Sequence, residues 1–252
     1  MHASEIEAAS THKTNPMVET STLWLDAQES GEIVYFLFQS PARLERYNLT
    51  TETWLSSITL SDTPTAFTVD ADGLYIAFSR RVSHFQLDGT SETHLRNTDT
   101  DIKSLHTIGA YLYINYSSYP YGKLVSVDKI SGTFIDSKSY LYDVLNGSSV
   151  APSIGKLFAR TSGISPSDIV QVILNTDGTL GSSTDSPYHG NYPNATKTYV
   201  FPGDGRVVDS AGIIYNASDL TYSNSFAGSV NDITFYEDLP IVLRGNKLIA
   251  FS

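Results

Sequence analysis

Short runs of alternating apolar and polar residues cover most of the chain, and turn-forming residues separate them. In the run from Leu74 to Phe78, for example, Leu74, Ile76 and Phe78 share one face of an extended strand. A convincing 3.6-residue period is absent from every window of about eleven residues or more, which argues against helices. The pattern therefore predicts an all-β protein.

One kind of hairpin recurs along the chain, with a short apolar strand, a turn containing Asn or Asp, and a strand rich in Thr or Ser. Its five copies cover residues 44–54, 82–90, 124–134, 170–179 and 213–221. The spacings are 38, 42, 47 and 41 residues, measured between Asn48, Gln86, Asp128, Asn175 and Asn216. A repeat of roughly forty residues is typical of the four-stranded blades of a β-propeller.

A second hairpin lies before each of these copies. These hairpins are expected at residues 21–38, 63–78, 102–116, 148–159, 199–208 and 232–243. The turn from Asp70 to Gly73 contains Asp-Gly between alternating apolar runs, which is a strong hairpin signal. Each repeat therefore supplies four consecutive strands.

The blade count depends on the two ends of the chain. About six repeats fit, but the last repeat ends at its third strand, Lys247–Phe251. We expect residues before Thr20 to supply the missing strand, because a strand added there removes an exposed edge. The alternative is a seventh blade or a further domain beyond Ser252. The sequence thus predicts a propeller of four-stranded antiparallel blades over residues 19–252, closed by a polar segment, residues 1–18.

The first kind of hairpin, with Asn or Asp in its turn, resembles those of quinoprotein-like and surface-layer-type propeller repeats. The closest match to their apolar–x–Asp–x–x–Thr–Gly pattern is the stretch from Val127 to Thr133, and 47–52 and 174–178 match more loosely. The resemblance covers most of the chain, but its motifs encode turns, so it implies the fold and leaves the function open. The Trp docking motif of quinoprotein enzymes, the Asp-box of sialidases and the Gly-His/Trp-Asp pairs of WD40 proteins are all absent.

The composition narrows the class of partner. The net charge is −11 and the isoelectric point is near 4.8, and Arg80–Arg81 is the largest basic cluster. Nucleic acid is therefore not expected as a partner, and neither is an anionic membrane surface. An apolar run of the ~18 residues that would insert into a bilayer is also absent. A chain without Cys that is poor in Lys and rich in Ser, Thr and Tyr favours a bacterial protein that is secreted, on the cell surface or periplasmic.

Three oxygen-bearing side chains alternate at Asn97, Asp99 and Asp101, as they do in calcium-binding loops. The glycine and the glutamate that complete such a loop are absent, and a turn between two blades explains the pattern equally well. Calcium is the one cofactor that the sequence suggests, and these three residues are its candidate ligands.

Catalytic motifs are scarce. The six His show no metal-binding spacing. The Gly-x-Ser-x-Gly motif that carries the nucleophilic serine of a Ser–His–Asp triad does not occur. Six-bladed lactonase-type propellers hold calcium with Glu, Asn and Asp of inner strands. Glu19, Asn231 and Asp232 are the comparable residues here, although they form no recognisable group. The sequence therefore favours a protein without catalytic activity.

Two tyrosine-containing loops are the most suggestive features for binding. The first is expected from Tyr116 to Lys123, between the second and third strands of the third blade. The second runs from Gly181 to Lys197, between the fourth and fifth blades. The candidate ligand-binding residues are Tyr116, Tyr119, Tyr121, Asp185, Tyr188, His189 and Tyr192. We expect both loops to lie on one face of the propeller, where tyrosines offer a rigid surface to a sugar or a protein. The alternative is that these rings fill gaps between blades.

The sequence thus favours a binding or adhesion module outside the cytoplasm, with a protein or carbohydrate ligand, that forms part of a larger protein or complex. A calcium-dependent, lactonase-type hydrolase and a structural assembly scaffold are the alternatives.

Overall fold

The computed structural model describes residues 3–5, 24–118, 121–141, 145–162, 164–236 and 238–251. These residues form β-strands and one short 3₁₀ helix, η1 (Pro152–Ile154). A helix long and apolar enough to cross a membrane is not found among them. Six four-stranded antiparallel sheets make up the blades of a β-propeller, as the sequence predicts.

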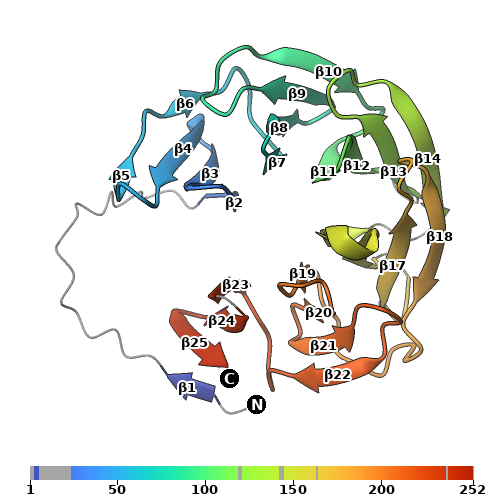
Figure 1. Ribbon diagram of the computed structural model, residues 1–252. Helices are drawn as coiled ribbons and strands as arrows, with labels where there is room; N and C mark the ends of the chain where they lie inside the picture. The colour runs from blue at the N-terminus through green and yellow to red at the C-terminus, as the bar shows by residue number, and fades with distance from the viewer. Residues whose placement is uncertain are drawn as a thin grey trace. The chain divides into compact units, whose positions relative to one another are not determined.

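The chain divides into two compact units, whose strands are labelled in Figure 1. The first unit comprises Glu19–Leu141 and Asp177–Leu180, and it contains the first three blades. The first blade has the strands β2 (Asp26–Ser30), β3 (Ile33–Gln39), β4 (Ala42–Asn48), β5 (Thr53–Trp54) and β6 (Ile58–Thr59). Its outer strand is split, because β5 and β6 both pair with β4. The second blade has β7 (Ala66–Asp70), β8 (Gly73–Phe78), β9 (Arg81–Phe85) and β10 (Thr93–Asn97). The third has β11 (Ile102–Ile108), β12 (Tyr111–Ser118), β13 (Tyr121–Asp128) and β14 (Phe134–Leu141).

The second unit comprises residues 1–18, Tyr142–Thr176 and Gly181–Ser252. The fourth blade has β15 (Asn146–Ala151), β16 (Lys156–Arg160), β17 (Ile169–Leu174) and β18 (Leu180–Asp185). The fifth has β19 (Thr198–Val200), β20 (Arg206–Asp209), β21 (Ile213–Asn216) and β22 (Tyr222–Ser225). The sixth has β23 (Asp232–Tyr236), β24 (Leu239–Arg244), β25 (Lys247–Phe251) and β1 (Ala3–Glu5).

The outer strand of the sixth blade comes from the N-terminal segment, as expected from the missing strand. β1 pairs antiparallel with β25, with Ala3 opposite Phe251 and Glu5 opposite Ile249. The sheet order is therefore β1-β25-β24-β23. The pairing gives β25 a neighbour on both sides, so its backbone groups on the outer side are not left as an open edge.

Local turn chemistry explains why the hairpins form where the sequence places them. β7 ends at Asp70 and β8 begins at Gly73, which has a φ of +151° that L-residues rarely adopt. In three of the outer hairpin turns an Asp is followed two residues later by a Thr. The Asp Oδ1 accepts hydrogen bonds from the backbone N–H and the hydroxyl of that Thr in the pairs Asp88–Thr90, Asp177–Thr179 and Asp219–Thr221. These hydrogen bonds hold the pKa of each of the three carboxyls below its usual value.

The cores lie between successive blades of a unit. In the first unit, Leu37 and Leu44 of the first blade pack with Leu74 and Ile76 of the second. A further core joins the second and third blades. In the second unit, equivalent cores join the fourth blade to the fifth and the fifth to the sixth. Apolar burial between sheets is thus what holds each set of three blades together.

A largely buried lysine also links the second and third blades. Lys129 follows β13, and its Nζ lies 2.7 Å from an oxygen of Asp70 and 2.6 Å from an oxygen of Asp72. Asp70 ends β7, and Asp72 lies in the turn between β7 and β8. The lysine side chain is 9% exposed, so the two carboxylates replace the water that it would otherwise bind.

The pairing of β1 with β25 can be tested by proline substitution. Ser4→Pro removes a backbone donor and fixes φ at a position opposite Ala250, so we expect it to disrupt this pairing. The expected loss is about 1–3 kcal/mol of unfolding free energy, measured by urea denaturation. Ser4→Ala is the control and should unfold at nearly the same urea concentration as the original chain. Equal midpoints for the two variants would contradict a contribution of β1 to stability.

Candidate binding surface

Three tyrosines come together beside the outer strands of the fifth blade. Tyr188 and Tyr192 lie on the connection from β18 to β19, and Tyr222 begins β22. The rings of Tyr192 and Tyr222 are stacked, with centroids 5.7 Å apart and planes inclined by 14°. Tyr188 meets Tyr192 edge to face at 5.2 Å. We call Tyr188, Tyr192 and Tyr222 the tyrosine cluster.

Hydrogen bonds hold the connection against the blade. The Tyr188 hydroxyl accepts a bond of 2.9 Å from the backbone N–H of Tyr222. The N–H of Asn191 donates to the carbonyl of Tyr188 at 2.7 Å and closes a turn within the connection. At its start, the hydroxyl of the buried Ser186 donates to Oδ1 of Asp168 at 2.8 Å. These bonds hold the connection at Ser186 and at Tyr188, and Tyr192 is held by its ring contacts.

The cluster is open to solvent on one side and packed on the other. Tyr222 is 42% exposed, whereas Tyr188 and Tyr192 are half-buried. Tyr192 also meets the fully buried Tyr215 edge to face at 5.9 Å. Burial and the neighbouring phenols of Tyr188 and Tyr222 raise the pKa of Tyr192.

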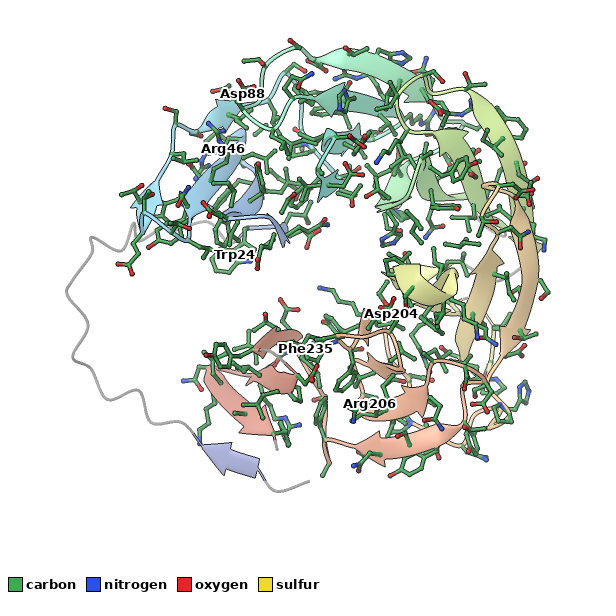
Figure 2. All side chains as sticks on the ribbon, in the orientation of Figure 1. Trp24, Arg46, Asp88, Asp204, Arg206 and Phe235 are labelled. Carbon is green, nitrogen blue, oxygen red and sulfur yellow. The ribbon has the colours of Figure 1, made fainter. Side chains whose placement is uncertain are left out.

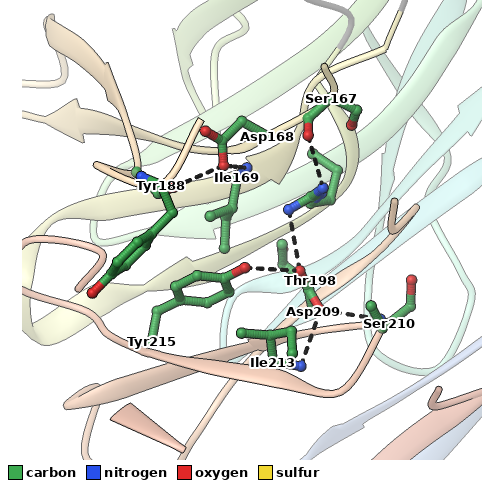
Figure 3. A network of polar contacts seen from close by, with 12 residues as sticks. Ser167, Asp168, Ile169, Tyr188, Thr198, Asp209, Ser210, Ile213 and Tyr215 are labelled. Atoms are coloured by element: carbon green, nitrogen blue, oxygen red, sulfur yellow. Dashed lines mark hydrogen bonds and ion pairs between the residues drawn. The ribbon is translucent and has the colours of Figure 1, made fainter. Parts of the chain in front are cut away.

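A buried ion pair holds Tyr215, whose ring contacts Tyr192; Figure 3 shows Tyr215 beside Asp209. The Arg160 guanidinium lies 3.1 Å from Oδ2 of Asp209, and the two side chains are 1% and 0% exposed. The Tyr215 hydroxyl donates to the same oxygen at 3.3 Å. The other carboxylate oxygen accepts from the N–H groups of Ala211 and Ile213 at 3.0 and 3.2 Å. Burial raises the pKa of Tyr215, and the adjacent Asp209 carboxylate raises it further. These buried groups therefore hold the Tyr215 ring in its contact with Tyr192.

The structure brings together part of the predicted ligand-binding set. Tyr188 and Tyr192 are in contact, and the exposed Asp185 and His189 belong to β18 and to the same connection. Tyr222, which stacks on Tyr192, was not predicted as a binding residue. Its contact with the connection joins residues 34 positions apart in the chain, and single-sequence patterns carry no signal for such pairs.

The other predicted loop is mostly strand. β12 extends to Ser118 and β13 starts at Tyr121, and the two strands pair up to Ser118 opposite Tyr121. Tyr116 is therefore a strand residue and is only 6% exposed, so the expectation of an exposed loop tyrosine is wrong at this position. The ladder continues because β14 pairs with the same end of β13, with Leu141 opposite Tyr121. Tyr119 and the side chain of Tyr121 lie outside the described residues. These residues belong to the first unit and the tyrosine cluster to the second, so a common face for the two loops stays a prediction.

The candidate calcium ligands have protein partners. The Asn97 Oδ1 lies 3.1 Å from Nε2 of His94. The Asp101 Oδ1 accepts from the Ser79 hydroxyl at 2.6 Å and lies 3.5 Å from Nε of Arg80. The hydrogen bond from Ser79 and the charge of Arg80 lower the pKa of Asp101. Asp99 is exposed on the same turn. These contacts are those of a turn between two blades, and calcium binding here stays a hypothesis.

The residues considered for a hydrolase also make local backbone contacts. The Asn231 Oδ1 accepts from the N–H of Gly245 at 2.6 Å, and the Asp232 Oδ1 accepts from the N–H of Ile233 at 3.0 Å. Glu19 lies outside the described residues. Among the residues that are described, three or more His, Asp or Glu side chains nowhere gather as a metal site would require.

Comparisons with known proteins extend the description of the fold. The chain matches no protein-family model and no curated protein sequence. It is similar to the solved structure of Kuenenia stuttgartiensis hydrazine synthase, with 13% identity, a TM-score of 0.66, and coverage of 92% of this chain and 76% of that one. For Kluyveromyces lactis Hsv2 the identity is 12%, the TM-score 0.66, and the coverage 88% and 72%. For the computationally designed protein Ika8 these values are 10%, 0.61, and 88% and 81%. At such identities the likeness concerns the fold alone, and these propeller-type neighbours agree with the blades described above.

The buried ion pair predicts a large effect of a single substitution. Arg160→Met leaves the Asp209 carboxylate buried without its cation, so we expect a loss of about 3–5 kcal/mol in unfolding free energy, measured by urea denaturation. Arg160→Met combined with Asp209→Asn removes the uncompensated charge and should recover part of that loss. Arg80→Met is the matched control, because its ion pair with Asp101 is exposed and should contribute less than about 1 kcal/mol. Similar losses for Arg160→Met and Arg80→Met would contradict a supporting role for the buried pair.

Proposed function

We propose that this chain is a non-catalytic binding module that acts outside the cytoplasm and holds a protein or carbohydrate ligand against the tyrosine cluster. The observation that carries the proposal is the way the cluster is built. Its rings are stacked, hydrogen-bonded to the blade and supported by a buried ion pair, yet Tyr222 remains 42% exposed. Aromatic rings that are already fixed lose little conformational entropy when a ligand packs on them.

The surroundings of the cluster favour the same role. Residues of β18 after Leu180 are small or polar, and four of them, from Ser182 to Asp185, are exposed. They provide hydroxyl and carboxylate groups along the strand that leads into the connection. An apolar ring surface beside hydroxyl groups and a carboxylate that can form hydrogen bonds fits a sugar ring or a polar peptide.

The proposed location outside the cytoplasm has support from the composition. The chain has no Cys, few Lys and Arg, and many Ser, Thr and Tyr. Such a chain depends on no thiol chemistry and keeps a polar surface of low charge density. Adhesion, as part of a larger surface protein or complex, would use the module in this setting.

The binding role can be tested on a glycan array and on a peptide array. Tyr222→Ala removes the exposed ring of the cluster, and we expect binding to weaken by roughly tenfold or more, as for an aromatic residue at the centre of an interface. Tyr236→Ala is the control, because Tyr236 is 67% exposed but lies on β23 and makes no contact with the cluster. Both variants should keep the circular dichroism spectrum of the original chain. If Tyr222→Ala binds the same array members with unchanged affinity, the cluster is not the binding surface.

A further inference from the structure

Tyr192 takes part in every contact between two tyrosine rings in the described part of the chain. Its ring is stacked on that of Tyr222 and meets the rings of Tyr188 and Tyr215 edge to face. All four residues belong to the second unit, and they gather where the fifth blade packs with the fourth. These ring contacts are therefore internal to one compact unit.

The opposite side of the fifth blade has phenylalanines instead. The ring of Phe201 contacts those of Phe226 and Phe235, with centroids 6.3 and 4.9 Å apart. Figure 2 labels Phe235 of β23 and Arg206 of β20, which both contact the Phe201 ring. A phenyl ring has no hydroxyl, so it cannot give up a hydrogen atom as a phenol does. Of these two sides, only the one with the tyrosine cluster therefore combines ring contact with phenol chemistry.

The four phenols differ in how accessible they are. The Tyr215 hydroxyl is buried and donates to Asp209 at 3.3 Å. The Tyr188 oxygen accepts the backbone N–H of Tyr222 at 2.9 Å. The Tyr222 ring is 42% exposed and can be reached by a small oxidant, and the half-buried Tyr192 lies directly against it. The pair of Tyr192 and Tyr222 is thus the contact that is most open to chemistry.

The stack also suits a reaction between the two rings. Their planes are inclined by 14° and their centroids are 5.7 Å apart, so the two π systems face each other. An electron vacancy formed on the exposed Tyr222 can therefore pass to Tyr192. A bond between the rings requires their edges to meet. Tyr222 can turn toward Tyr192, because part of its ring is in solvent.

The composition of the chain gives such a bond a purpose. The chain contains no Cys, so it cannot form the disulfides that proteins outside the cytoplasm commonly use. It does contain 16 Tyr. Tyr192 and Tyr222 are 30 positions apart, and a covalent link over such a distance restricts the unfolded chain as a disulfide does.

We propose that Tyr192 and Tyr222 form a site of oxidative cross-linking, at which a one-electron oxidant, such as a haem peroxidase with hydrogen peroxide, joins the two rings as dityrosine. Each phenol loses one electron and its hydroxyl proton and becomes a radical. The two radicals couple through ring carbons next to their oxygens. The hydrogens on these carbons then move to the oxygens, which restores both phenols. The peroxide takes up the two electrons and two protons and is reduced to water.

The cross-link ties the connection between β18 and β19 to the outer strand β22. It preserves both rings and both hydroxyls, so it is compatible with the ligand proposed for the tyrosine cluster. The inference draws on the proposed location outside the cytoplasm, where conditions are oxidising, but not on the nature of that ligand.

The cross-link can be tested by treating the purified full chain with a haem peroxidase and hydrogen peroxide. We expect a product with the mass of one chain less two hydrogen atoms and with the fluorescence of dityrosine. After trypsin digestion, one fragment should join residues 161–197 to residues 207–244, because trypsin cleaves after Arg160, Lys197, Arg206 and Arg244. Fragment-ion spectra should place the bond between Tyr192 and Tyr222. The cross-linked chain should unfold at a higher urea concentration than the untreated chain.

Phenylalanine variants separate this pair from the other tyrosines. Tyr222→Phe and Tyr192→Phe each keep a ring but remove a hydroxyl, so the yield of the joined fragment should fall at least about tenfold. Tyr236→Phe is the matched control, because Tyr236 is 67% exposed and lies in the same tryptic fragment as Tyr222. It should leave the yield unchanged. Oxidation of the urea-unfolded chain should also lower the yield, because the contact is then lost.

Three results would overturn the proposal. Absence of dityrosine from the monomer, with or without covalent dimers, would mean that the two rings do not couple within one chain. An unchanged yield of the joined fragment in Tyr222→Phe would place the bond at another tyrosine. Equal yields from the folded and the urea-unfolded chain would mean that the fold does not select the pair. These outcomes concern the cross-link alone, whereas a failure of the array experiment concerns the ligand.

Discussion

Each blade is a thin sheet whose two faces both require cover, and this constraint governs the rest of the structure. The middle blades show it most clearly. All six residues of β8, from Gly73 to Phe78, are buried, although alternate side chains of a strand point to opposite faces. One face of this blade packs with the first blade and the other with the third. Polar groups that lie between blades must therefore bring their own partners, as Lys129 and Arg160 do.

This constraint separates what the sequence could predict from what it could not. Hairpins depend on neighbouring residues, and their turn chemistry is written locally, as in Asp70 to Gly73. The outer strand of the sixth blade was predictable for a different reason, because a blade with three strands leaves an open edge that a terminal segment can cover. Burial of individual turn residues was not predictable. Hydropathy alone would bury Ile130 and expose Lys129. Counted over the whole residue, however, Ile130 is 59% exposed and Lys129 only 7%, because the carboxylates that bind the lysine belong to another blade.

In the candidate site, too, some residues could be predicted from the sequence and others could not. Tyrosines 188 and 192 stood out because they lie on a long connection, where binding residues are common. Tyr116 stood out in the same way, but the loop was an error. Tyr, Ser and Gly around Pro120 are compatible with a strand when a neighbouring strand continues beside them, and β14 does so. Tyr222 presents the opposite case. It begins a strand, where an aromatic residue is the expected filler of a core, and only the structure shows that its ring is exposed and stacked on Tyr192.

The exposed aromatic residues are therefore more informative than the buried ones. A large ring between two blades needs no explanation beyond packing, whereas a ring left in water gives up the free energy that burial would provide. The tyrosine cluster does so with phenols that also hydrogen-bond, beside the hydroxyls of β18 and the carboxylate of Asp185, and this chemistry suits polar ligands such as sugars.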